Sequence, residues 1–134
     1  MKKYRKKLIR EKTVIAIYQK LLIDITEEEI YNYLDSDKEL ANDKDDYDYC
    51  AMFINSIINN LEKYKEEVAK HLKKGWSIDR LSKMELAILL VGCYELLETD
   101  QRKEVVINEA VELSKKYCDD DVYKFVNGIL NKIK

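Results

Sequence analysis

The stretch that decides the fold is Val105–Leu130, VVINEAVELSKKYCDDDVYKFVNGIL. Its apolar residues recur three and four positions apart on both sides of an acidic turn, Asp119–Asp121. This spacing places the apolar side chains of each half on one helical face, so the stretch predicts a helical hairpin. Gly128, inside the second helix, lowers helix stability by about 1 kcal/mol relative to alanine, and we expect a close-packing or contact reason for it.

The composition favours one all-helical domain. The chain has 134 residues, no proline and three glycines, which leaves few signals for β-hairpins. The longest apolar run, Leu86–Tyr94, is too short to span a bilayer, and the N-terminus lacks the apolar core of a signal peptide. Three widely spaced cysteines indicate reduced thiols rather than a disulfide framework. We therefore expect a cytoplasmic protein.

The apolar spacing predicts about seven helices in two packed helical parts, an N-terminal part of about residues 1–75 and a C-terminal part of about residues 76–134. The first helix should run from about residue 5 to about residue 23. The run Leu86–Tyr94 is apolar nearly all round and predicts a central buried helix, whose Gly92 indicates a close helix–helix approach. Trp76 and Leu81 are expected to pin the two parts together.

Local signals predict the ends of several helices. Thr26 and Ser82 are each followed three residues later by glutamate, which is the pattern of a capping box.

The acidic stretch 35–48 is expected to be a surface loop. It lacks the glycine and the terminal glutamate of an EF-hand, so we do not expect a calcium site there. Asp121 is expected to cap the last helix.

The charge is unevenly distributed along the chain. Residues 1–12 carry seven basic side chains and one acidic one, whereas the remainder carries 17 basic and 25 acidic side chains. One interpretation is a solvated, frayed helix start. The other is a segment that follows a nucleic-acid backbone, and it is favoured because cations at a helix N-terminus oppose the helix dipole. The basic residues are Lys2, Lys3, Arg5, Lys6, Lys7, Arg10 and Lys12.

The two motifs INEAVEL (107–113) and KFVNGIL (124–130) resemble the C-terminal signature of the NusB family of bacterial transcription antitermination factors. Arg10-Glu11 followed by Ala16–Tyr18 is similar to the N-terminal pattern of that family. IDRL and AILLVGCYEL, between residues 76 and 97, are similar to its middle signature. The resemblance covers nearly the whole chain and is weakest between about residues 24 and 50.

The resemblance implies an all-helical fold and a function without catalysis. It implies that the protein binds the single-stranded boxA element of nascent ribosomal RNA together with the ribosomal protein NusE. The pair then joins the elongating RNA polymerase with other Nus factors. No cofactor and no metal are implied, and no membrane.

The resemblance also assigns residues by position. The basic segment, Lys2, Lys3, Arg5, Lys6, Lys7 and Arg10, would contact RNA, and so would Lys124, Phe125 and Asn127. Tyr18, Glu85 and Asp121 would face the protein partner or lie beside the RNA surface. Cations neutralise phosphate, and an aromatic ring stacks an unpaired base for roughly 1–3 kcal/mol. Core packing is the alternative for Phe125, and the capping box is the alternative for Glu85.

Several positions depart from the family pattern. The start is rich in lysine where arginine is usual, and lysine lacks the planar fork with which arginine recognises phosphate and bases. Leu8 stands where a third basic residue is common, and Leu90, Arg102 and Cys118 replace a frequent arginine, proline and glycine. None of these changes lies within INEAVEL or KFVNG. They concern the RNA base preference rather than membership in the family.

The sequence fits three other functions less well. An enzyme is disfavoured because the chain has one histidine, no glycine-rich phosphate loop and no Glu-x-x-His pair for a di-iron site. A methyltransferase carrying a NusB-like domain would need further chain. A helical interaction module or a homodimer that binds no RNA remains the alternative, and the basic N-terminus argues against it.

Overall fold

The computed structural model describes residues 5–133, and over that range the chain is all-helical, with no strand. The prediction of an all-α fold is confirmed, with one short helix more than expected. The helices are α1 (Lys6–Ile23), α2 (Glu27–Asp35), α3 (Lys38–Ala41), α4 (Lys44–Asn59), α5 (Leu61–Ala69), α6 (Lys83–Glu98), α7 (Lys103–Tyr117) and α8 (Val122–Lys132), with a 3-10 turn η1 at Ile78–Arg80.

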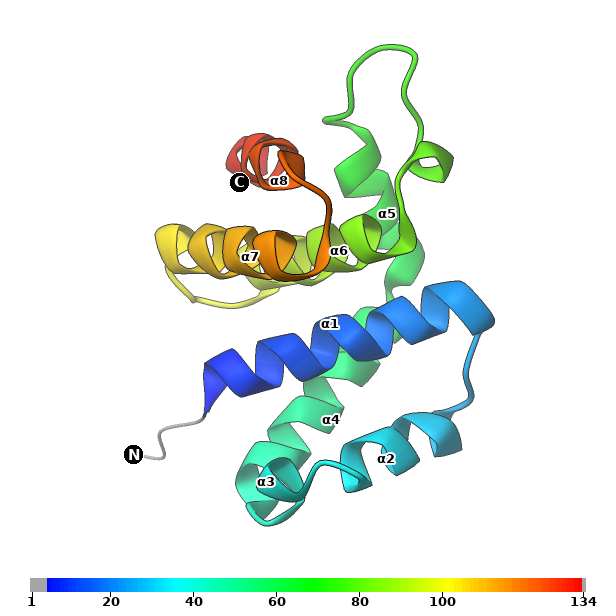
Figure 1. Ribbon diagram of the computed structural model, residues 1–134, viewed down its shortest axis with the longest axis vertical. Coiled ribbons are helices and arrows are strands. Elements are labelled where there is room, and N and C mark those ends of the chain that lie inside the picture. Colours follow the sequence, from blue (N-terminus) through cyan, green and yellow to red (C-terminus); the bar gives the residue numbers. More distant parts are fainter. Residues whose placement is uncertain (1–4, 134) are drawn as a thin grey trace.

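Helix α6 forms the centre of the molecule. Ten consecutive residues, from Leu86 to Glu95, are buried. α6 packs against α1, α4, α5, α7 and α8. Figure 1 shows α1 and α4 on one side of it and α5 and α8 on the other. An apolar sequence without a polar face needs protein on every side, and these five helices supply it.

The two helical glycines lie in opposite surroundings. A Cβ atom added to Gly92 would lie 2.9 Å from Cδ1 of Leu130, so the predicted close approach is confirmed and joins α6 to α8. A Cβ added to Gly128 would meet no atom within 4 Å. Close packing therefore does not explain Gly128.

The stretch 35–48 is not the loop that its acidity suggested. α3 lies within it, and α4 begins at Lys44. The carboxylate of Asp37 accepts a hydrogen bond from the backbone N–H of Leu40, and that of Asp43 accepts from Asp45 and Asp46. These aspartates are helix caps, a role that favours the same residue types as loops do. Both predicted capping boxes, at Thr26 and Ser82, are confirmed.

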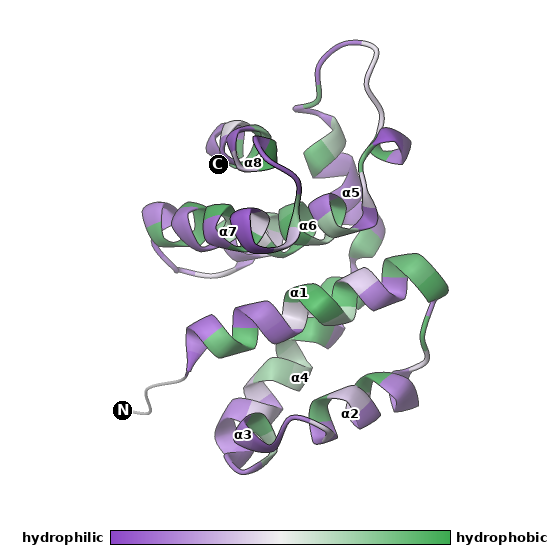
Figure 2. Cartoon of the chain, viewed as in Figure 1, coloured by the Kyte–Doolittle hydropathy of each residue, from purple (hydrophilic) through white to green (hydrophobic). Residues whose placement is uncertain are grey.

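The chain packs around one continuous core that contains side chains from α1, α2, α3, α4, α5, α6, α7 and α8. Figure 2 shows α1 ending in strongly hydrophobic residues, and two of these, Leu22 and Ile23, are 53% and 66% exposed. No helix in the described residues is long and apolar enough to cross a membrane. A division into two parts near residue 75 stays a prediction, and α5, which precedes that boundary, packs on α6.

Candidate nucleic-acid and partner-binding surfaces

The described cations of the basic segment lie at the start of α1, and Lys12 follows them; Lys2 and Lys3 lie outside the described residues. Each of the described cations, Lys12 included, is bonded to an acceptor from another part of the chain. The pairs are Arg5–Glu39 at 2.7 Å, Lys6–Gln101 at 2.9 Å, Lys7–Glu109 at 3.1 Å, Arg10–Glu95 at 2.8 Å and Lys12–Asp37 at 2.6 Å.

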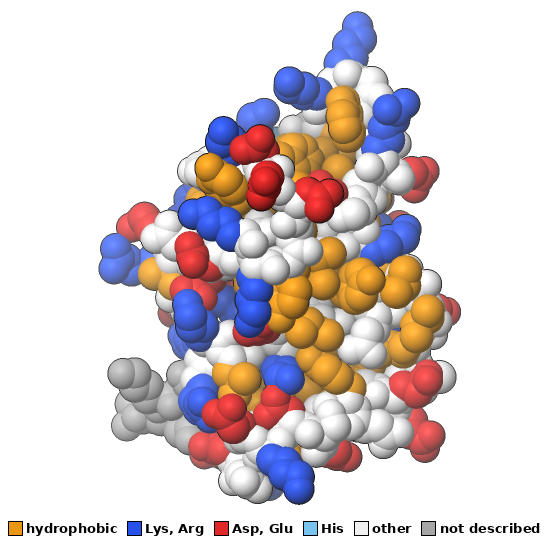
Figure 3. Space-filling view, in the orientation of Figure 1, with side chains coloured by type: hydrophobic (Ala, Val, Ile, Leu, Met, Phe, Trp, Pro, Cys, Tyr) orange, Lys and Arg blue, Asp and Glu red, His pale blue; other side chains and the backbone are white. Residues whose placement is uncertain are grey.

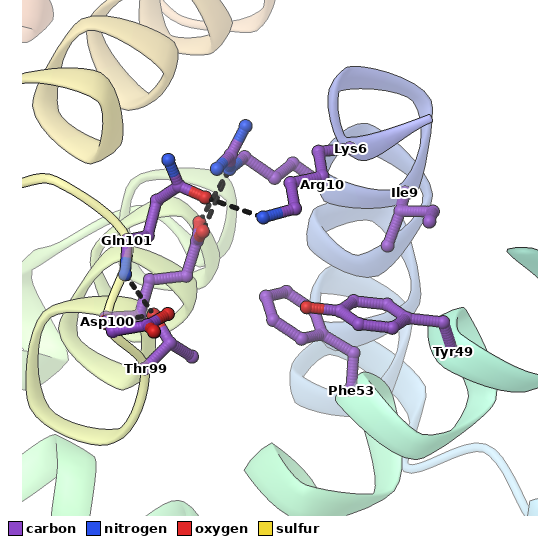
Figure 4. A pocket seen from close by; sticks show the side chains of 9 residues that line it. Lys6, Ile9, Arg10, Tyr49, Phe53, Thr99, Asp100 and Gln101 are labelled. Atoms are coloured by element: carbon purple, nitrogen blue, oxygen red, sulfur yellow. Dashed lines mark hydrogen bonds and ion pairs between the residues drawn. The ribbon is translucent and has the colours of Figure 1, made fainter. Parts of the chain in front are cut away.

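Arg10 is not a surface cation. Its Nε donates to both carboxylate oxygens of Glu95, at 2.8 and 2.9 Å, and the two side chains are only 8% and 6% exposed. Figure 4 shows Arg10 of α1 beside Lys6 and Gln101, and Glu95 of α6 lines the same pocket. Burial raises the pKa of Glu95, against the lowering effect of Arg10. Nε of Arg10 is therefore occupied and holds α1 against α6, which disfavours the RNA contact expected of this residue.

The remaining described members of the segment stay at the surface. The side chains of Arg5 and Lys7 are 51% and 76% exposed although both are paired, and Lys6 is exposed as well. Exposed ion pairs of this kind contribute little to stability, because water competes for both partners. Their cations can therefore exchange a carboxylate for a phosphate.

A buried carboxylate fixes the first turn of α1. Arg5, at the N-cap position, makes no side-chain cap, and the first turn contains no acidic residue. Asp46 of α4 is fully buried, and its Oδ1 accepts a hydrogen bond from the backbone N–H of Arg5 at 3.3 Å. This acceptor from another helix satisfies a backbone N–H at the start of α1 that has no local side-chain cap. Sequence spacing gave no signal for it, because the two residues are 41 positions apart.

A second surface is the α8 groove, a hollow of about 500 Å³ beside the exposed face of α8. Trp76, Leu81, Phe125, Gly128 and Ile129 line it, with Lys73 and Lys132 among the charged residues and Glu85 and Asp121 among the acidic ones.

Trp76 does not pin two parts of the chain together. Its side chain is 50% exposed, and the guanidinium of Arg80 lies 5.8 Å from its ring centroid. The sequence-based expectation gave this tryptophan a packing role together with Leu81, which is buried, and so missed a residue of the groove. The signal that could have found it is its setting, because it follows a Lys-Lys-Gly stop rather than standing on an apolar face.

The position of Phe125 fits both core packing and a contact surface in part. It is half-buried and packs against the core, yet it also lines the α8 groove near Gly128. Lys124 and Asn127 are exposed on the same helix. α8 thus carries all three residues that were assigned to RNA there, and Phe125 lines the open groove.

A third surface is the partner groove, a hollow of about 430 Å³ where α1 ends beside the start of α6 and the α7–α8 turn. Tyr18, Leu22, Met84, Glu85, Tyr117 and Cys118 are among its lining residues. Figure 3 shows hydrophobic side chains gathered over this part of the molecule, above the C-terminal half of α1. Tyr18 and Glu85, 67 positions apart in the sequence, therefore share one apolar surface.

Two acidic residues assigned by the resemblance lie at these grooves, Glu85 at both and Asp121 at the α8 groove alone. Glu85 completes its capping box, with its carboxylate accepting from the N–H of Ser82 at 3.1 Å, and it lines both grooves. Asp121 stands at the N-cap position of α8 with φ 76° but makes no side-chain cap, so the expected cap is wrong. Its carboxylate lies 3.4 Å from Nζ of Lys124, and it lines the α8 groove.

The fold and these surfaces define a class of protein: a small all-helical domain that presents cations on one helix start and aromatic side chains in an open groove. That combination is typical of proteins that bind single-stranded nucleic acid. Within residues 5–133, no group of three or more histidine, cysteine or carboxylate side chains is placed to hold a metal ion.

Comparison with known proteins identifies the family. The family model described as NusB family matches residues 7–134. The transcription antitermination protein NusB of Ligilactobacillus salivarius is 36% identical over 111 residues, which cover 82% of each chain. That of Staphylococcus epidermidis is 44% identical over 88 residues, or 66% of this chain and 67% of the relative. This chain belongs to the NusB family.

Solved structures agree with the sequence comparison. NusB of T. maritima has a TM-score of 0.85 at 32% identity, covering 99% of this chain and 92% of that one. A complex of the antitermination factors NusB and NusE with double-stranded RNA has a TM-score of 0.84 at 29% identity, covering 96% and 94%. The identification made from INEAVEL and KFVNGIL is confirmed.

Proposed function

We propose that this protein is a transcription antitermination factor that binds boxA-type RNA together with the ribosomal protein NusE and joins the elongating RNA polymerase with other Nus factors. The observation that carries the proposal is family membership over residues 7–134, joined to a surface with separate cationic and aromatic parts. The related NusB–NusE complex with RNA supports both partners. The function is one of binding in the cytoplasm, without a catalytic step.

The RNA surface consists of two patches. The exposed cations Arg5, Lys6 and Lys7, with Lys2 and Lys3 expected to extend them, would neutralise phosphates at the start of α1. Phe125, with Lys124 and Asn127, would contact bases at the α8 groove, where Trp76 adds a second aromatic face. An open Cβ position at Gly128 allows a base or sugar to approach the backbone closely.

The partner groove is proposed to receive NusE. Its apolar lining around Tyr18 and Leu22 suits the core of a protein interface, and Glu85 at its edge suits a polar rim. Asp121 lies on the neighbouring α8 groove, where RNA and partner would meet. A homodimer formed through the same apolar groove is the alternative occupant.

The first experiment measures fluorescence anisotropy of labelled boxA RNA, a scrambled single strand and a boxA duplex, with and without purified NusE. We expect the boxA strand to bind more tightly than the scrambled strand, and NusE to increase that difference. With four or five phosphate contacts, log K should fall with log salt at a slope of about −3 to −3.5. Equal binding to all three RNAs that NusE does not change would refute the proposal and favour an interaction module.

Replacement of Phe125 separates the two interpretations of that residue. Phe125→Ala should weaken boxA binding roughly 5- to 150-fold, the equivalent of one lost stacked base, without changing the salt slope. Trp76→Ala is the matched variant, because its side chain is 50% exposed and its loss leaves the core intact. If Phe125→Ala abolishes the cooperative unfolding transition while Trp76→Ala leaves RNA binding unchanged, the groove is not a base-binding surface.

A further inference from the structure

Two of the cations that would bind RNA phosphate, Arg5 and Lys7, are already paired with the protein's own carboxylates. Glu39 of α3 bonds Arg5 at 2.7 Å, and Glu109 of α7 bonds Lys7 at 3.1 Å. The two carboxylates come from helices that are 34 and 102 positions away from their cations, so neither pair results from neighbouring turns of one helix. The tertiary fold places one anion beside Arg5 and one beside Lys7.

We propose that Glu39 and Glu109 are internal competitors that lower the affinity of the basic segment for any RNA phosphate. The inference rests on the proposed function and adds to it two residues that determine how strongly generic RNA is held. A phosphate that binds Arg5 or Lys7 must displace a carboxylate, which is then left beside the phosphate.

The burial of the pairs determines which of them can take part. The Arg5–Glu39 side chains are 51% and 67% exposed, and Lys7 is 76% exposed above a Glu109 that is 23% exposed. Water reaches these atoms, so exchange requires no unfolding. The Arg10–Glu95 pair, 8% and 6% exposed, and the buried Asp46 are excluded from such exchange and keep the helix start in place.

The competition acts equally on all sequences, because it concerns phosphate contacts and not base contacts. Generic RNA gains little besides phosphate contacts, so the opposing carboxylates keep it weakly bound. RNA that also reaches the α8 groove, or that arrives with a protein partner, gains enough additional contact to displace them. The carboxylates thus raise the threshold that an RNA must exceed to remain bound.

The test is the double variant Glu39→Gln/Glu109→Gln, which keeps side-chain size and removes both competing charges. Affinity for boxA and scrambled strands should rise together, by roughly 2- to 30-fold if each exposed pair contributes its usual amount. The salt slope should become steeper by up to about 1.4, since two more cations are free to replace counterions. The ratio between the two RNAs should change by less than about twofold.

The matched control is Glu28→Gln/Glu62→Gln. These residues are exposed on α2 and α5, and Glu62 pairs with Lys65 at 3.3 Å rather than with the basic segment. The control changes the net charge by the same amount, so an equal gain in affinity would show that total charge matters and would overturn the proposal.

Two other results would also overturn it. Unchanged affinity and slope in the Glu39/Glu109 variant would mean that the carboxylates do not compete. Weaker binding would mean that they orient the cations or contact RNA themselves. Failure of the proposed function is distinguishable, because it appears in the unmodified protein as equal affinity for boxA and scrambled strands, whatever the variant does.

Discussion

Lys7 and Arg10 stand on neighbouring turns of α1, and each is paired with a glutamate, yet they belong to different parts of the molecule. The Lys7–Glu109 side chains are 76% and 23% exposed, whereas the Arg10–Glu95 side chains are 8% and 6% exposed. Lys12–Asp37, at 22% and 15%, lies between them. The three cations belong to one basic run in the sequence but differ in solvent exposure. Lys7 is a surface charge, Arg10 holds two helices together in the interior, and Lys12 is intermediate.

The same contrast separates Gly92 from Gly128. One is enclosed by the Leu130 side chain and the other faces open space. Residue type and helical setting are the same for both. Two glycines that look alike in the sequence therefore differ once the helices have packed: Gly92 serves helix packing, and Gly128 is accessible.

The largest effect on the free energy of unfolding is expected at the buried Arg10–Glu95 pair. Arg10→Met leaves the Glu95 carboxylate buried without its partner, and the free energy of unfolding should fall by about 3–5 kcal/mol. Arg10→Met/Glu95→Met removes both charges and should recover most of that loss. Urea unfolding followed by circular dichroism measures both variants. A loss below about 1 kcal/mol in the single variant would mean that water reaches Glu95 and that the grading by burial is wrong.

Replacing Gly92 and Gly128 by alanine should change the free energy of unfolding in opposite directions. Gly92→Ala places a methyl group against Leu130 and should reduce the free energy of unfolding by about 1–3 kcal/mol. Gly128→Ala meets no atom and should increase it by up to about 1 kcal/mol, while weakening boxA binding if RNA approaches the backbone there. Equal destabilisation in both variants would contradict the open position of Gly128.

Removing the Lys12–Asp37 pair, which is intermediate in exposure, should lower the free energy of unfolding by a smaller and pH-dependent amount. Asp37 caps α3 and bonds Lys12, so Asp37→Ala should lower the free energy of unfolding by about 0.5–2 kcal/mol at pH 7. The hydrogen bond from Lys12, followed by that from the N–H of Leu40, lowers the pKa of Asp37.

The sign of the pH dependence follows from that lowered pKa. The unfolded chain binds the Asp37 proton at higher pH than the folded chain does, so the carboxylate stabilises the fold above its ordinary pKa and ceases to do so as pH falls through the lowered folded pKa. Asp37→Asn keeps a capping side chain and removes only the charge. Its deficit relative to the unmodified protein, measured by urea unfolding, should be present at pH 7 and shrink in acid below about pH 4. A deficit that is independent of pH would assign the stabilisation to the cap alone.

The smallest effect on folding is expected where the effect on RNA is greatest. Lys6→Ala/Lys7→Ala should change the free energy of unfolding by less than about 0.5 kcal/mol per residue, because both side chains are exposed. The variant should weaken binding of all single strands alike and flatten the salt slope by about 1.4. Anisotropy titrations at several salt concentrations measure this. Unchanged affinity would remove the two lysines from the RNA surface.

The sequence by itself determined the helices and the family. Apolar spacing located α6 and the hairpin of α7 and α8, and Thr26–Glu29 and Ser82–Glu85 marked two helix starts, because these signals act over one or two turns of the same helix. INEAVEL and KFVNGIL identified the family for a similar reason, since they are contiguous. The acidic stretch 35–48 misled because aspartate favours loops and helix caps alike.

Only the tertiary structure decided which of these residues face water. The partners of Arg5, Lys7 and Arg10 are 34, 102 and 85 positions away, and no local pattern records such distances. Trp76 is exposed because the turn that carries it stands at the rim of the α8 groove. Burial arises from the packing of helices and not from the order of residues. The sequence therefore shows how many cations the protein has, while the fold determines which of them can bind a phosphate.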